Sequence, residues 1–315
     1  MPLPKTMPIP MKATPQHQRL LENTPKASDG EIKLLERETG FSYRKAIGEL
    51  IYAMITCRPD ISYSVIKLSQ YSTRPAAIHF EAVKMFFKYM WQTKDKGITY
   101  WRKQPRLDLP SYPLPSTEQD NKYDYNESLE RKVTSENTIN SAVDSDYAGD
   151  TSHRKSVTGL TIRLAGGCIL YKTRYQDTIA MSSTEAEFTA AAEAGKFMLY
   201  VRSILEEINM EQQYATTLYE DNRGALLMAN AQQPTKRTRH MDIKTFALQD
   251  WCERDLIVLH KIHTLHNWAD TMTKAQSKYL FHRHMYHIMG NITPDYSKQM
   301  LGIHYDKHSS NALSN

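Results

Sequence analysis

The hydrophobic period of this chain changes from helical spacing in its first third to strand-like alternation after residue 140, and that change limits the folds it can adopt. From residue 43 to residue 91 apolar residues recur at helical spacing. Pro59 and Pro75 interrupt this pattern, which predicts three short helices packed on one another. From residue 141 to residue 171 the pattern alternates as in strands, around a turn at 165–167. A helical segment followed by a β-meander is neither a helical bundle nor a β-sandwich.

The remainder of the second half alternates between helices and strands. In chain order the expected elements are strands at 141–143, 157–164 and 168–171, a long helix at 184–208, a strand at 217–219, helices at 222–230 and 240–252, a strand at 256–259, and helical sequence from residue 268. Five strands interleaved with helices predict the α/β class, with a mixed sheet flanked by helices.

Composition divides the chain into five segments. Residues 1–40 contain several prolines and no sustained period, which predicts a disordered leader. Residues 41–101 form the helical segment, and residues 102–140 are rich in Pro, Ser, Asn and charged residues, as in a linker or an insertion. Residues 141–290 form the α/β domain, and residues 291–315 are expected to be a disordered tail.

Overall composition excludes some classes of protein without naming a function. With 40% hydrophobic and 24% charged residues among 315, the chain is of ordinary globular composition and has no apolar run of membrane-spanning length. Prolines near the start replace the apolar core of a signal peptide, and the three cysteines form no CxxC pair. We therefore expect an intracellular protein without a membrane partner, in a cytoplasmic particle or in the nucleus. The net charge of +5 only weakly favours a polyanionic partner.

Four acidic residues occupy the ends of strands or the starts of helices. Asp144 and Asp221 follow expected strands, Glu187 lies in the first turn of the long helix, and Asp270 begins the last helical stretch. Carboxylates in such positions can converge at one edge of a sheet. Phosphodiester hydrolysis uses such a cluster, because oxygen ligands can hold two Mg²⁺ ions about 4 Å apart.

Each of these residues also has a purely structural interpretation. Asp144 and Asp221 are ordinary turn residues at strand ends, and Thr184 with Glu187 fits a capping box. Asp270 is a favourable charge at a helix N-terminus. Single positions do not separate the two interpretations, so the combination of motifs has to decide.

Short motifs surround the four acidic residues in a fixed order. They are DSDYAGD (144–150), RKSVTG (154–159), SSTEAEF (182–188), DN (221–222), RTRHMD (237–242) and NWADTMTK (267–274). In this order they resemble the ribonuclease H region of copia-type retrotransposon polyproteins. Residues 43–61 also resemble the segment that joins polymerase to nuclease in these polyproteins, so the likeness covers about residues 41–290.

The resemblance implies a fold, an activity and a set of metal ligands. It implies a ribonuclease H-like mixed five-stranded sheet with flanking helices, preceded by a small helical, thumb-like connection segment. The implied activity is endonucleolytic hydrolysis of the RNA strand of RNA–DNA hybrids with two Mg²⁺ ions, for which Mn²⁺ can substitute. Asp144 and Asp221 would hold the metals, Glu187 would help to hold one and orient substrate, and Asp270 would support the second metal and the water.

Two of the four positions have a rival nearby. Asp146 competes with Asp144, which we prefer because the first acidic residue of the family directly ends its strand. Glu185 competes with Glu187, which we prefer because the family's second Glu precedes an aromatic position, here Phe188.

The expected partners are an RNA–DNA hybrid and the polymerase part of a retrotransposon polyprotein. His263 or His266 could aid product release, as a loop histidine does in cellular ribonucleases H. The chain contains no Tyr-x-Asp-Asp motif of a polymerase palm, so we expect no DNA synthesis. Val157, Tyr171 and Arg239 depart from the family's usual residues without removing a ligand, and the alternative function is a catalytically inactive, nucleic-acid-binding remnant.

Overall fold

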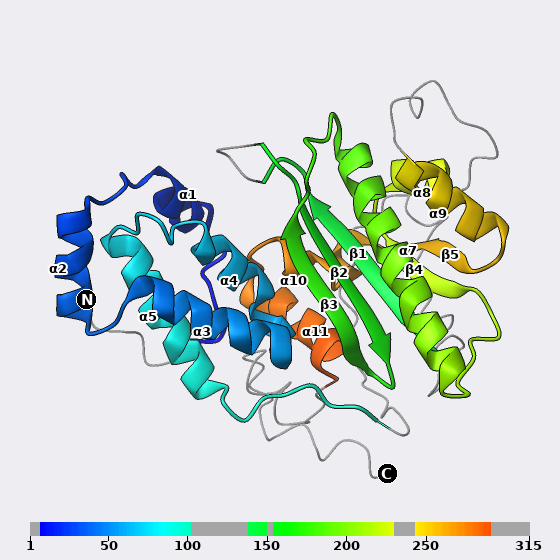
Figure 1. Cartoon of the computed structure of the whole chain (residues 1–315), viewed down its shortest axis with the longest axis horizontal. Helices are drawn as coiled ribbons and strands as arrows, with labels where there is room; N and C mark the ends of the chain where they lie inside the picture. The colour runs from blue at the N-terminus through cyan, green and yellow to red at the C-terminus, as the bar shows by residue number, and fades with distance from the viewer. Residues whose placement is uncertain (1–6, 102–137, 150–153, 230–242, 291–315) are drawn as a thin grey trace, which may run out of the picture.

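The computed structural model describes residues 7–101, 138–149, 154–229 and 243–290 (Figure 1). The N-terminal half contains α1 (Pro15–Asn23), α2 (Asp29–Thr39), α3 (Tyr43–Thr56), η1 (Pro59–Ile61), α4 (Ser62–Ser69) and α5 (Ala77–Gln92). The second half contains β1 (Asn140–Asp146), β2 (Val157–Leu164), β3 (Gly167–Tyr175), α7 (Ser183–Glu207), β4 (Thr216–Glu220), α8 (Arg223–Ala229), α9 (Ile243–Glu253), β5 (Ile257–Lys261), η2 (Thr264–His266), α10 (Asp270–Thr273) and α11 (Lys278–Met289). Within these ranges no helix is both long and apolar enough to cross a bilayer.

The five strands form one mixed sheet in the order β3-β2-β1-β4-β5. The first three strands are an antiparallel meander, whereas β4 and β5 join it in parallel with β1. The predicted mixed five-stranded sheet with flanking helices is confirmed. Strand β1 extends further than expected, so Asp144 lies within the strand rather than directly after it, paired with Gly159 of β2.

Side chains alternate between the two faces of the sheet, and each face has its own apolar core. Val143 and Leu218 pack with the apolar face of α7 and with residues of α8 and α9. Their neighbours Ala142 and Tyr219 belong to the core on the opposite face, together with residues of α10 and α11. Helices therefore cover the sheet on both sides (Figure 1).

The N-terminal helices contribute to the second of these cores. Phe80 and Phe86 of α5 are buried in the same cluster as Met272 of α10 and Phe281 of α11. The rings of Tyr89 and Phe281 meet edge to face, with centroids 6.2 Å apart. The helices before residue 101 and the helices after the sheet therefore share one apolar core, although the composition changes after residue 101.

Residues 98–101 connect the helical segment to two distant parts of the second half. The Thr99 amide donates to the Met289 carbonyl at 2.7 Å, and the Trp101 amide donates to the Ala165 carbonyl at 2.8 Å. The predicted linker at 102–140 falls outside the described residues except for its last three, of which Asn140 already begins β1. The expected tail at 291–315 also lies outside the described residues.

The expectation of a disordered leader is wrong for the described part of residues 1–40. Helices α1 and α2 occupy most of it, and Met7 and Leu21 are buried in the core shared with the sheet. Two local sequence signals mark the ends of α2. Ser28 and Glu31 form a reciprocal capping box at its start, and Gly40 ends it in the left-handed conformation at φ 79°.

Candidate metal-binding site

Parallel pairing of β1 and β4 brings the first two predicted ligands to one edge of the sheet. Ala142 pairs with Tyr219, so two residues further along both strands come Asp144 and Asp221. Asp144 is buried, with 2% of its surface exposed, and Asp221 is partly buried. Two acidic side chains from separate elements thus meet because of the strand register.

The long helix α7 supplies the third carboxylate and separates it from its rival. Ser182 is the N-cap, and its side-chain oxygen accepts from the Glu185 amide at 3.1 Å. Glu185 in turn accepts from the Met181 amide at 2.7 Å, so it serves the helix end. Glu187 is buried, with 7% exposed. The capping arrangement considered for Thr184 and Glu187 is therefore formed two residues earlier, by Ser182 and Glu185.

Asp144, Glu187 and Asp221 form a compact triangle of carboxylates, called the triad below. Each offers one oxygen, and these three oxygens lie within 4.8 Å of one another. The Glu187 Oε2 atom is buried without a hydrogen-bond partner among the described residues. Burial and the neighbouring carboxylates raise the pKa of Glu187 to about 12 and also raise the pKa of Asp221. Oxygen ligands in this arrangement fit a hard divalent cation, which would offset the repulsion.

Asp270, the fourth predicted ligand, begins α10 but is not one of the three carboxylates that form the triad. Its Oδ1 atom is 2.6 Å from the Lys274 ammonium, and its Oδ2 atom accepts from Gln276 Nε2 at 3.1 Å. Burial, followed by the charge of Asp144, raises the pKa of Asp270 to about 8, although Lys274 opposes the shift. The structure therefore places Asp270 beside the triad and joins it to Asp144 through Lys274, which is 3.9 Å from Asp144 Oδ2.

Close packing holds α10 against the sheet. A Cβ atom added to Gly159, the strand partner of Asp144, would lie 2.5 Å from Met272 Cβ and 2.7 Å from Thr273 Cγ2. The Thr273 hydroxyl donates to Asp144 Oδ2. Only a residue without a side chain allows this approach, which brings the start of α10 to the acidic edge.

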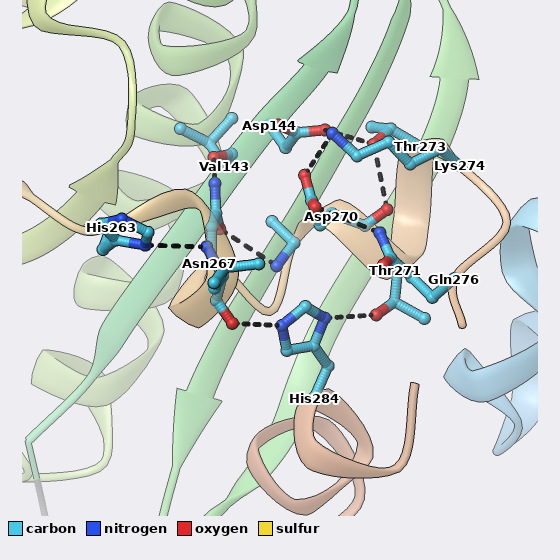
Figure 2. Close-up of polar contacts among 12 residues, drawn as sticks. Val143, Asp144, His263, Asn267, Asp270, Thr271, Thr273, Lys274, Gln276 and His284 are labelled. Carbon is cyan, nitrogen blue, oxygen red and sulfur yellow. Dashed lines mark hydrogen bonds and ion pairs between the residues drawn. The ribbon is translucent and has the colours of Figure 1, made fainter. Parts of the chain in front are cut away.

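Asn267 fastens the loop before α10 to β1 (Figure 2). Its fully buried side chain donates to the Val143 carbonyl at 2.9 Å and accepts from the Ala269 amide at 3.1 Å. Trp268 next to it donates to Thr161 Oγ1 at 2.9 Å. The motif at 267–274 predicted a role only for Asp270, so the contacts of Asn267 and Trp268 were not predicted.

The second rival, Asp146, ends β1 and does not join the triad. Its carbonyl accepts from the Gly149 amide at 3.3 Å, and its carboxylate lies where a Cβ of Gly149 would be. Burial raises the pKa of Asp146 to about 6. The geometry places Asp144 closer than Asp146 to the other candidate ligands.

Glu220 is a buried carboxylate that the sequence interpretation missed. It is fully buried at the end of β4, and its Oε1 atom accepts from the Asn222 amide at 2.9 Å. Burial and the charge of Asp221 raise its pKa well above the ordinary value. Glu220 is one of the carboxylates that raise the pKa of Glu187. Its position next to Asp221, at the end of an apolar strand, was the signal in the sequence that could have identified it.

The histidines considered for product release lie on and beside η2. His263 is the N-cap of η2 and accepts from the Leu265 amide at 3.2 Å. His266 is 2.7 Å from Arg283 Nη2, and burial lowers its pKa to about 4. His284 of α11 lies between Thr271 and the Leu265 carbonyl, at 3.0 Å and 3.2 Å. These contacts connect α10 and α11 to η2, and a role in product release stays a prediction.

Known proteins resemble both the sequence and part of the structure. No protein-family model matches the chain. The Pol polyprotein of transposon TNT 1-94 from Nicotiana tabacum is 29% identical over 233 residues, which are 74% of this chain and 15% of the polyprotein. The Pol polyprotein of transposon RE2 from Arabidopsis thaliana is 27% identical over 239 residues, or 76% of this chain and 14% of that protein. Secreted RxLR effector protein 161 of Plasmopara viticola is 30% identical over 152 residues, which are 48% of this chain and 85% of the effector.

A solved structure with a likeness to this chain is ribonuclease H1 LC11 isolated from compost. It matches 44% of this chain and 93% of its own, with a TM-score of 0.34 and 16% identity. The aligned part of this chain spans only 15% and 14% of the length of the two Pol polyproteins. Because these relatives align along three quarters of its length, the chain is a homologue of the Pol polyproteins of copia-type retrotransposons.

Proposed function

We propose that this chain is a ribonuclease H-type endonuclease that hydrolyses the RNA strand of RNA–DNA hybrids within a copia-type reverse-transcription machinery. The observation that carries the proposal is the triad, in which three carboxylates from β1, α7 and the end of β4 offer oxygens within 4.8 Å of one another. The unpartnered, buried Glu187 Oε2 supports a cation ligand at this point. Buried polar atoms normally have a hydrogen-bond partner, and none of the described residues supplies one to this oxygen.

The triad residues would hold Mg²⁺ or Mn²⁺, with Asp270 supporting a second ion beside Asp144. Such ions, when bound, activate a water molecule and stabilise the leaving oxygen of a phosphodiester. The protein's own contribution is position: Gly159 lets α10 approach β2, and Asn267 fixes the loop that precedes Asp270. Burial of Asp144 and Glu187 lowers the local dielectric and strengthens their attraction for a cation.

The substrate and the partners in this proposal come from homology rather than from geometry. Six motifs in one order resemble the ribonuclease H region of copia-type polyproteins, and the relatives are Pol polyproteins. On this basis we assign the RNA–DNA hybrid as substrate and the polymerase part of such a polyprotein as partner, inside the cell. A polymerase activity of the chain itself is not part of the proposal.

The test is incubation of the purified chain with a hybrid labelled on either strand, in Mg²⁺ or Mn²⁺. We expect cleavage of the RNA strand only, leaving 3′-hydroxyl and 5′-phosphate ends, and no cutting of double-stranded DNA. The double variant Asp144→Asn, Glu187→Gln is the matched control for a contaminating nuclease, because it keeps the shape of both side chains. Cleavage that persists in excess chelator, or in the double variant, contradicts the proposal.

The same assay separates the proposal from its alternative. A non-catalytic remnant would retain the hybrid in a filter-binding measurement and leave both strands intact with either metal. The substitutions Val157, Tyr171 and Arg239, which depart from the usual residues of the family, motivate that comparison.

A further inference from the structure

Lys274 follows directly after α10, four residues after Asp270. Its ammonium lies 2.6 Å from Asp270 Oδ1 and 3.9 Å from Asp144 Oδ2, and Figure 2 shows it between the two carboxylates. The lysine side chain is 41% exposed, whereas those of Asp144 and Asp270 are only 3% and 6% exposed. The cation thus reaches from the surface to a pair of buried acids.

Both carboxylate oxygens of Asp270 have a polar neighbour in this arrangement. Gln276 donates to its Oδ2 atom at 3.1 Å, and Lys274 pairs with its Oδ1 atom. Asp144 Oδ2 faces the same side, because it accepts from the Thr273 hydroxyl. Asp270 Oδ2 is therefore hydrogen-bonded, whereas buried Oδ1 has no hydrogen-bond partner among the described residues and is held only by the ion pair with Lys274.

The two other carboxylates of the triad, Glu187 and Asp221, differ from this pair in having no ion pair with a basic side chain among the described residues. Among the described residues, the ligand group formed by Asp144, Glu187 and Asp221 includes an oxygen of Glu187 that has no hydrogen-bond partner. The triad therefore offers carboxylate oxygens to a metal cation. The space between Asp144 and Asp270 already contains a cation, the Lys274 ammonium.

We propose that the Lys274 ammonium takes the position between Asp144 and Asp270 that a second divalent ion requires, so that the resting protein binds one ion strongly at the triad. The second ion then binds strongly only when the lysine has moved outward. This inference rests on the proposed function, because it concerns the same carboxylates. It makes Lys274 a positioning residue that controls metal stoichiometry rather than a ligand.

Lysine can perform this exchange because of its chemistry. An ammonium at the end of four flexible carbons is a compact point charge that can swing between a buried acid and solvent. The lysine side chain is 41% exposed, so solvent is within its reach. A divalent ion and an ammonium cannot occupy the same place, so the two compete for the same pair of carboxylates.

The experiment measures Mn²⁺ binding to the full chain by titration calorimetry and by electron paramagnetic resonance, without nucleic acid. Lys274→Met removes the charge and keeps the apolar stem, whereas Lys274→Arg retains a cation. Lys278→Met is the matched control, because Lys278 is an exposed lysine at the start of α11. Circular dichroism would show that each variant is folded.

We expect one strongly bound Mn²⁺ in the wild type, in Lys274→Arg and in Lys278→Met. In Lys274→Met the second ion should bind at least tenfold more tightly, with the broadened spectrum of two neighbouring Mn²⁺ ions. Equal second-ion affinity in the wild type and Lys274→Met overturns the inference, as does an equal gain in Lys278→Met.

The outcomes separate this inference from the function on which it rests. If the wild type cuts the hybrid but Lys274→Met binds Mn²⁺ as the wild type does, only the role of Lys274 fails. If no variant binds Mn²⁺ and the wild type cuts no hybrid, the proposed function fails as well.

Discussion

Replacing Gly159 by alanine tests whether α10 must approach β2 as closely as the structure shows. The added Cβ would lie 2.5 Å from Met272 Cβ, 2.7 Å from Thr273 Cγ2 and 3.2 Å from the Ala269 carbonyl. Ordinary contacts between carbon atoms are about 3.5–4.0 Å long, so α10 must move outward by roughly 1 Å. Rotation of a side chain moves neither Met272 Cβ nor the Ala269 carbonyl, so at least these two contacts require a shift of the backbone.

The magnitude follows from two opposing effects. Overpacking of this kind costs about 1–3 kcal/mol of stability, whereas replacing glycine restricts the unfolded chain and recovers about 0.4–1 kcal/mol. We therefore expect Gly159→Ala to lower the free energy of unfolding by about 1–2 kcal/mol. The displacement also moves Asp270 and Thr273 away from Asp144, and a misplacement of about 1 Å can lower the rate of hybrid cleavage by up to about 100-fold.

Gly48→Ala is the matched control, because Gly48 lies on the exposed side of α3 and an added Cβ meets nothing within 4 Å. Alanine favours a helix interior over glycine, so this variant should be more stable by about 0.5–1 kcal/mol with unchanged cleavage. Urea unfolding of both variants, with the metal-free protein, measures the difference. If Gly159→Ala is as stable as Gly48→Ala and cuts hybrids at the wild-type rate, the close approach of α10 to β2 is wrong.

Three further predictions concern the acidic cluster and the shared core. Asp221→Asn should abolish hybrid cleavage. The metal-free variant should be as stable as the wild type, or more stable by about 0.5–2 kcal/mol, because the substitution removes one of several repelling charges. A melting temperature clearly below that of the wild type would make Asp221 a structural residue. The metal-free wild type should lose several kcal/mol of stability as pH rises from about 4 to about 8. The reason is that the folded protein keeps protons on Asp146 and Asp270, whose pKa values are raised to about 6 and about 8, after the unfolded chain has lost them. Thermal melting at constant ionic strength checks this, and stability that rises with pH would contradict it. A fragment of residues 102–315 should be insoluble or unfolded, because removal of the N-terminal helices exposes the buried side chains of Met272 and Phe281. A soluble fragment that melts cooperatively would show that the second half folds alone.

The elements with a strong hydrophobic period could be predicted from the sequence. The long helix expected at 184–208 is α7 at Ser183–Glu207, and the strand expected at 157–164 coincides with β2. Burial of one face imposes these periods locally, so they can be read without the rest of the chain. The proximity of Asp144 and Asp221 could also be predicted from the sequence, because the ends of parallel strands lie at the same edge of a sheet.

Features that depend on contacts between distant segments could not be read in this way. Helices α1 and α2 are polar, and their anchors, such as Leu21, are buried by residues far along the chain. The His79 ring, for example, is 2.9 Å from the Leu21 carbonyl. The pairing of Lys274 with Asp270 and the burial of Glu220 likewise require the folded arrangement, because their sequence neighbours predict only a helix end and a strand end.

The packing of the helical segment explains how the acidic edge can be tolerated. Several buried carboxylates with raised pKa values oppose folding, so the elements that carry them need support from elsewhere. Helix α7 receives that support from the core on its own face of the sheet. The short α10 has only four residues, and it is supported by Gly159 on one side and by the core shared with α4, α5 and α11 on the other. The N-terminal helices therefore contribute to the site without supplying a ligand, because they fix the one element that brings Asp270 and Lys274 to Asp144.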